Sequence, residues 1–219
     1  MSILVSASTN PPKECDLMQY IADLAKTEVD YIHCDIMDGK FVPNKTLNHK
    51  TVGKIHKLTS KPLDVHLMVQ KPWRVACKYI KNGASIVSVH FEAFDNSKLL
   101  AKTLQKIRKM GAFASLAINP TTAVSEIEQF LPLCDMVLVM SVQPGQSGQQ
   151  FLPETLQKIS LLHQAADKQK ANFVVEVDGG VTPDIAATLA KHKVNVVVMG
   201  NALFLSANKP QTIESVHRL

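Results

Sequence analysis

The sequence is poor in cysteine and lacks the patterns that thiol chemistry uses. No two of its four cysteines form a Cys-x-x-Cys pair; they are Cys15, Cys34, Cys77 and Cys134. This spacing argues against a disulfide framework and against a zinc site built from thiolates. Cys34 falls between His33 and Asp35, so in a strand it points to the opposite face, where we expect it to pack under a helix.

Long apolar runs, aromatic residues and arginine-rich blocks are also scarce. No run approaches the roughly 20 apolar residues needed to cross a bilayer, and the N-terminus lacks the basic and apolar regions of a secretory signal. We therefore expect a cytoplasmic protein without a membrane partner. Aromatic residues make up only 5% of the chain and the net charge of +5 is spread over many segments, so no nucleic-acid partner is expected. A mild positive charge suits an anionic small substrate.

What the chain does contain is a regular alternation of strand and helix patterns. Alternation of this kind implies parallel strands with right-handed crossovers. Eight units in 219 residues predict a (β/α)8 TIM barrel, with residues 1–219 as a single domain. The predicted strands cover 3–8, 29–37, 63–69, 84–91, 112–118, 135–142, 173–178 and 194–199. The predicted helices cover 14–27, 50–58, 72–82, 97–109, 124–130, 153–170 and 183–191, with Pro11 and Pro12 ending the first strand.

A doubly wound open sheet is the alternative fold. That fold carries a glycine-rich dinucleotide loop after its first strand. The segment Ser8-Thr-Asn-Pro-Pro12 is nothing like such a loop, so the barrel is favoured.

Polar side chains gather at the predicted strand ends, where the active site of such a barrel lies. His33 and Asp35 share one face of a strand, because side chains two residues apart point the same way. His66 ends the next strand, and Asp178 ends a strand on the other side of the barrel. Each residue alone would be read as a satisfied polar group near the core. Together, two imidazoles and two carboxylates without thiolate predict a site for one divalent metal ion, Zn, Fe, Mn or Co.

Such an ion can polarise a ketone and stabilise an enediolate. Because Asp35 and Asp178 come from different strands, they can flank a substrate and move a proton from one face to the other. Supporting roles are predicted for residues beside this set: Asp64 and Glu176 lie one step deeper, and His90 with Glu92 ends the fourth strand. Asp38 is expected to fix the long loop 38–46.

A phosphate site is predicted from three glycine-containing loops after the last three strands. Glycines let backbone N–H groups approach an anion, and barrel loops in this region often hold a phosphate. The residues are Gly145, Gln146, Ser147, Gly148, Gly179, Gly180, Gly200 and Asn201. Met37, Met68 and Met140 stand at strand ends. They either pack in the hydrophobic core or form a weakly polar layer over the enediolate.

Four motifs resemble the ribulose-phosphate 3-epimerase family over nearly the whole chain. They are His33-Cys-Asp-Ile-Met-Asp-Gly-Lys-Phe-Val-Pro-Asn44, Leu63-Asp-Val-His-Leu-Met68, Met140-Ser-Val-Gln-Pro-Gly145 and Glu176-Val-Asp-Gly-Gly180. The resemblance implies a metal-dependent barrel that interconverts D-ribulose 5-phosphate and D-xylulose 5-phosphate in the pentose phosphate pathway. By resemblance, His33, Asp35, His66 and Asp178 bind the metal, Asp35 and Asp178 are the acid/base pair, and Ser8 and His66 contact substrate. The partner is then a phosphorylated ketose, and we also expect a homo-oligomer.

The chain departs from the usual family pattern around the predicted phosphate site. Gly145-Gln-Ser-Gly148 replaces Gly-Phe-Gly-Gly, Gly200-Asn201 replaces Gly-Ser, and Asn48 stands where a glycine is common. These changes leave open D-allulose 6-phosphate 3-epimerase activity or a non-catalytic phosphosugar-binding protein. The decarboxylase and hexulose-phosphate synthase group shares the barrel, but it needs an Asp-x-Lys-x-x-Asp strand that Asp35-Ile-Met-Asp38 does not match.

Overall fold

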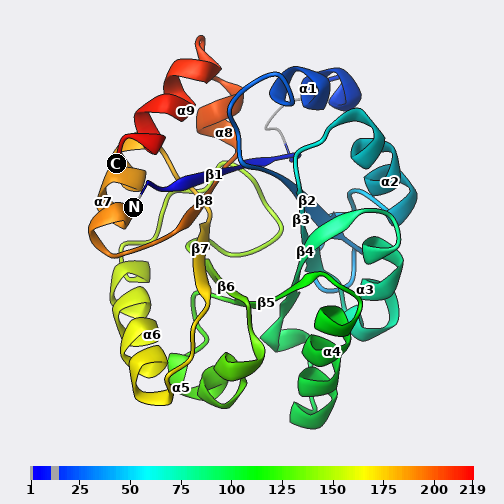
Figure 1. The fold of residues 1–219 in the computed structure, drawn as a ribbon, viewed down its shortest axis with the longest axis vertical. Coiled ribbons are helices and arrows are strands. Elements are labelled where there is room, and N and C mark those ends of the chain that lie inside the picture. Colours follow the sequence, from blue (N-terminus) through cyan, green and yellow to red (C-terminus); the bar gives the residue numbers. More distant parts are fainter. Residues whose placement is uncertain (1, 11–14) are drawn as a thin grey trace.

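The protein is described by a computed structural model that covers residues 2–10 and 15–219. Its eight strands are parallel and close into a barrel in chain order, with β8 pairing back onto β1 (Figure 1). The predicted (β/α)8 TIM barrel is therefore confirmed. The strands are β1 Leu4–Ser8, β2 Tyr31–Met37, β3 Leu63–Met68, β4 Ala84–His90, β5 Phe113–Ile118, β6 Met136–Met140, β7 Val174–Asp178 and β8 Val196–Met199.

Helices lie between the strands in the chain and form a ring outside the barrel (Figure 1). They are α1 Leu17–Leu24, α2 His49–Leu58, α3 Pro72–Ile80, α4 Ser97–Lys109, α5 Val124–Ile127, α6 Thr155–Gln169, α7 Pro183–Lys191, α8 Asn201–Phe204 and α9 Lys209–His217. Two 3₁₀ turns, η1 Phe91–Ala93 and η2 Glu128–Leu133, complete the set. Across the described ranges, no helix is both long enough and apolar enough to span a bilayer.

The helix predicted over 124–130 is divided in the structure. α5 ends at Ile127, and η2 replaces its second half. Pro132 lies inside η2, and a proline both lacks an N–H donor and collides with the carbonyl four residues before it, so a regular α-helix cannot continue there.

The chain ends differ from the prediction in two ways. α8 and α9 follow β8 but were not predicted, because they are short and α9 has a proline in its first turn. The break predicted at Pro11 and Pro12, and the start of the first helix at Glu14, lie outside the described residues.

Asn48 illustrates how a departure from the family pattern is used locally. Its side-chain oxygen accepts hydrogen bonds from the backbone N–H groups of Lys50 (2.9 Å) and Thr51 (3.1 Å), at the start of α2. An asparagine at this N-cap position satisfies two N–H groups that have no partner within the helix. A glycine at position 48 could not do so.

The inside of the barrel changes from apolar to polar along its axis. At the N-terminal ends of the strands, a cluster of side chains fills the interior: Leu4, Tyr31, Ile86, Met136, Val174 and Val196. Higher up, the inward-facing positions of β2 and β3 are polar, and the register pairs His33 with Asp64 and Asp35 with His66. The intervening residues, including Cys34 as predicted, point outward into the core under the helices. The N-terminal end of the barrel is therefore closed by apolar side chains, and the polar side chains lie toward the C-terminal end.

Candidate active site

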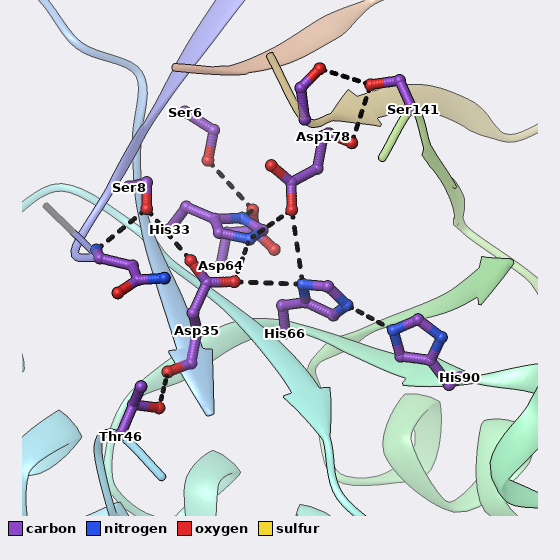
Figure 2. A network of polar contacts seen from close by, with 12 residues as sticks. Ser6, Ser8, His33, Asp35, Thr46, Asp64, His66, His90, Ser141 and Asp178 are labelled. Atoms are coloured by element: carbon purple, nitrogen blue, oxygen red, sulfur yellow. Dashed lines mark hydrogen bonds and ion pairs between the residues drawn. The ribbon is translucent and has the colours of Figure 1, made fainter. Parts of the chain in front are cut away.

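Four donor side chains from β2, β3 and β7 converge at the C-terminal end of the barrel (Figure 2). Asp35 Oδ1 lies 3.3 Å from both His33 Nε2 and His66 Nδ1. Asp178 Oδ2 lies 3.8 Å from His33 Nε2 and 3.7 Å from His66 Nδ1. The structure thus brings together all four residues predicted as metal ligands.

The spacing and burial of these atoms fit a metal ion. Ligands at about 2.0–2.2 Å around a tetrahedral ion lie about 3.3–3.6 Å from one another, close to the 3.3–3.8 Å observed. His33 Nε2 is fully buried and makes no hydrogen bond. A buried polar atom without a partner is costly, and a cation between these groups would satisfy it. The buried His/Asp group could therefore hold a metal ion.

The far side of His33 is held by a buried carboxylate. His33 Nδ1 lies 2.5 Å from Asp64 Oδ2, which also accepts a hydrogen bond of 3.0 Å from the Ser6 hydroxyl. With its Nδ1–H donated to Asp64, the ring presents Nε2 to the other three ligands. Glu176 is fully buried behind Asp64, and burial together with the charge of Asp64 raises the pKa of Glu176 well above its usual value.

The pKa values of the two aspartates of the site are shifted in opposite directions. Burial, reinforced by the charge of Asp35, raises the pKa of Asp178 to about 7. Burial also opposes ionisation of Asp35, but the positive charge of His33 and the contacts with His33 and His66 outweigh it and hold the Asp35 pKa well below its usual range. Burial works against a charge on His33, yet Asp64 and Asp35 raise the pKa of this imidazole well above its usual value. Carboxyl pKa values that are pushed apart suit an acid/base pair.

A cavity of about 320 Å³ opens above this group. Asp35 and Asp178 reach it, whereas His33 and His66 are fully buried below. All the other residues predicted to bind substrate line its walls: Ser8, Met37, Met68, Met140, Gly145, Gln146, Ser147, Gly148, Gly179, Gly180, Gly200 and Asn201. The predicted metal and phosphate regions therefore belong to one cavity.

Ser8 and the methionines shape the floor of the cavity. The Ser8 hydroxyl donates to Asp35 Oδ2 at 3.1 Å and accepts from the backbone N–H of Asn10 at 3.0 Å. This leaves Asp35 Oδ1 facing the histidines. Met37 and Met68 are buried beside Val42 and form an apolar wall next to the carboxylates.

The glycine loops that line the cavity are built for close backbone approach. Gly179 has φ +125°, and a Cβ there would lie 2.5 Å from a methyl group of Val142.

Asn44, in the loop after β2, donates from Nδ2 to the carbonyl of Gly145 at 2.6 Å and so ties two loops of the site together. Asp38 fixes the first of these loops as predicted, by accepting hydrogen bonds from Lys40, Phe41 and Gln70 N–H groups. No Lys or Arg is found among the described residues that line the cavity, so only backbone groups and neutral polar side chains of this lining are available to bind an anion.

Several residues of the site were not predicted. Ser141, one residue past β6, donates its hydroxyl to the carbonyls of Asp178 (2.9 Å) and Gly179 (2.6 Å) and so holds the end of β7 (Figure 2). Its position in the Met140-Ser-Val motif was the available signal. Val142, Thr182 and Leu205 also line the cavity. The strand predicted over 135–142 ends at Met140, so Val142 lies in the loop that follows. Thr182 and Leu205 also belong to loops, whose course cannot be read from periodicity.

Known sequences match nearly the whole chain. The model of the ribulose-phosphate 3 epimerase family matches residues 4–204. The chain is 39% identical to a Synechocystis sp. protein named ribulose-phosphate 3-epimerase, over 98% of this chain and 93% of that protein. It is 38% identical to an Arabidopsis thaliana protein named ribulose-5-phosphate-3-epimerase, chloroplastic, over 98% of this chain and 76% of that protein.

Solved structures with a similar fold are more distant in sequence. A structure of KGPDC from Streptococcus mutans superposes with a TM-score of 0.72 at 13% identity, covering 99% of this chain and 96% of the other. A structure of 3-hexulose-6-phosphate synthase gives 0.70 at 16% identity, covering 100% and 99%. These two similarities show the barrel alone. By the family model and the relatives at nearly 40% identity, the chain belongs to the ribulose-phosphate 3-epimerase family.

Proposed function

We propose that this chain interconverts D-ribulose 5-phosphate and D-xylulose 5-phosphate by removing the C3 proton from one face and returning a proton to the other. The observation that carries the proposal is the pair Asp35 and Asp178, which reach one cavity from β2 and β7 with pKa values shifted in opposite directions. The names of the relatives support the same reaction.

The two carboxyl groups divide the proton transfer between them. The depressed pKa of Asp35 makes it the base for one substrate, and Asp178, whose pKa is raised to about 7 before an ion binds, is assigned as the acid. Removal of the C3 proton gives an enediolate, and a proton delivered by Asp178 to the opposite face inverts C3. In the reverse direction the roles exchange. Protons must then pass between the carboxyl groups and solvent before the next turnover in the same direction.

We further propose that His33, His66, Asp35 and Asp178 hold one divalent ion, Zn, Fe, Mn or Co. When bound, such an ion supplies a Lewis acid for the ketone oxygen and stabilises the enediolate charge. Asp64 keeps His33 Nε2 turned toward that position. Met37, Met68 and Met140 surround the reacting carbons with groups that cannot donate a proton.

The phosphate of the substrate is assigned to the backbone N–H groups of Gly145–Gly148, Gly179–Gly180 and Gly200–Asn201. These segments line the part of the cavity formed by the loops after β6, β7 and β8. Oriented N–H groups favour an anion, and no lysine or arginine of the described cavity lining competes for it.

A turnover assay with purified, metal-supplemented protein tests the proposal. We expect conversion of ribulose 5-phosphate, with deuterium at C3 of the product in deuterated water, and poor conversion of unphosphorylated ribulose. Allulose 6-phosphate in the same assay decides between five-carbon and six-carbon substrates. Binding of metal and phosphosugar without any turnover would instead identify a non-catalytic binding protein.

A further inference from the structure

A chain of polar groups, from the buried His90 to the half-buried Glu92, leads away from His66 on the side opposite Asp35. His66 Nε2 lies 2.8 Å from His90 Nε2, and His90 Nδ1 lies 3.0 Å from Glu92 Oε2. Both imidazole rings are fully buried. Their centroids are 4.9 Å apart with the planes at 26°, so the two Nε2 atoms meet edge to edge, as a hydrogen bond between the rings requires (Figure 2).

The carboxylate of Glu92 is fixed at both oxygens. Oε1 accepts hydrogen bonds from the backbone N–H of Asn119 (2.7 Å) and from the buried Thr122 hydroxyl. Oε2 is then left for His90. An ionised carboxylate only accepts hydrogen bonds, so His90 must donate to it from Nδ1.

The position of the proton on His90 then determines the position of the proton on His66. A neutral imidazole carries a proton on one nitrogen and a lone pair on the other, and a histidine binds a metal ion in this neutral form. With Nδ1–H directed at Glu92, His90 accepts at Nε2. His66 must therefore donate from Nε2, which leaves the lone pair on His66 Nδ1, the atom that faces Asp35 and Asp178.

We propose that Glu92, acting through His90, is a positioning residue that fixes the proton of His66 on Nε2 and so prepares His66 Nδ1 to bind the divalent ion. The inference rests on the proposed cation site. In this assignment the two ligand histidines are oriented in different ways. Asp64 contacts His33 directly, whereas Glu92 acts on His66 through the imidazole of His90. Partners that orient a metal-binding histidine in this way typically contribute about 10–100-fold to metal affinity.

Glu92→Gln is a sharp test because it keeps size and shape but adds donors. Asn119 N–H and Thr122 Oγ both donate to the Oε1 position, so the glutamine carbonyl belongs there and its NH₂ group faces His90. His90 Nδ1 must then accept, which moves the His90 proton to Nε2 and the His66 proton to Nδ1. The variant should reverse both tautomers, whereas the exposed Glu126→Gln on α5 serves as a matched control.

Two readouts on metal-free protein labelled with ¹⁵N-histidine test the proposal independently of enzyme activity. Long-range ¹H–¹⁵N spectra should show His66 protonated at Nε2 in the wild type and in Glu126→Gln, and at Nδ1 in Glu92→Gln. Titration with Zn²⁺ alone should show affinity about 10–100-fold lower in Glu92→Gln than in the control.

A wild-type spectrum with His66 protonated at Nδ1 would overturn the proposal without any variant. Unchanged Zn²⁺ affinity in a folded Glu92→Gln protein with reversed tautomers would overturn it as well. Wild-type protein that shows the expected tautomers but binds no Zn²⁺ would refute the cation site itself, and with it this role of Glu92.

Discussion

The affinity of the site for a divalent ion should depend on pH. When the logarithm of this affinity is plotted against pH, the slope should change near pH 7. Binding requires a free lone pair on His33 Nε2 and an ionised Asp178. In the metal-free protein the His33 pKa is well above its usual value and the Asp178 pKa is about 7. Asp35 is already ionised because its pKa is depressed. Protons therefore compete with the ion at His33 and Asp178 but not at Asp35.

The size of the effect follows from the number of protons displaced. Where His33 is protonated, each ion displaces the His33 proton, and the affinity should fall as pH is lowered. Below pH 7 each ion also displaces the Asp178 proton, so the affinity should fall more steeply. This one further proton corresponds to about tenfold more loss of affinity per pH unit.

Competition between the protein and a chelating dye for Zn²⁺, in buffers that do not bind metal, measures this slope. Asp178→Asn should bind more weakly and lose the steepening near pH 7, while the exposed Asp184→Asn on α7 should retain it. A slope of one proton from pH 8 to pH 5.5 in the wild type would refute the role of Asp178. The same steepening in Asp178→Asn would refute it too.

Three further changes test the proposed catalysis and the architecture around it. Asp35→Asn and Asp178→Asn should each lower kcat by about 10²–10⁴-fold, with metal content measured alongside, and retention of wild-type kcat in either variant with full metal would contradict the acid/base assignment. Asn44→Ala removes the 2.6 Å hydrogen bond to Gly145, worth about 1 kcal/mol; KM for the phosphosugar should rise about fivefold in steady-state kinetics, and an unchanged KM would argue against coupling of the two loops. Asn48→Ala removes the cap of α2 and should lower the free energy of unfolding in urea by about 1 kcal/mol without changing kcat.

The fold and the convergence of the four His and Asp side chains could be predicted because both follow from short-range rules. Strand periodicity places His33 and Asp35 on one face, and the topology of a parallel barrel brings all C-terminal strand ends together. His66 and Asp178 then join them whatever the details of the loops. The four-residue group was therefore predicted from the sequence before any distance was known.

The remaining features depend on geometry that no local pattern encodes. The contact of His66 with His90 joins two strands and depends on the rotation of both rings, and the capture of Glu92 by Thr122 joins segments 30 residues apart. The division of α5 depends on how Pro132 meets the carbonyl of the preceding turn. Loop residues such as Thr182 reach the cavity through turns that periodicity does not describe.

The apolar cluster at the N-terminal ends of the strands has a kinetic consequence. Ile86, Met136 and Val196 and their neighbours fill the interior below the polar layer, so the cavity is entered from the C-terminal side, where its lining residues lie. Substrate and product then share one opening. A bound product excludes the next substrate, and its inhibition is competitive. In the proposed mechanism, the protons that reset Asp35 and Asp178 exchange through the same opening, most readily in the interval when the cavity holds neither sugar.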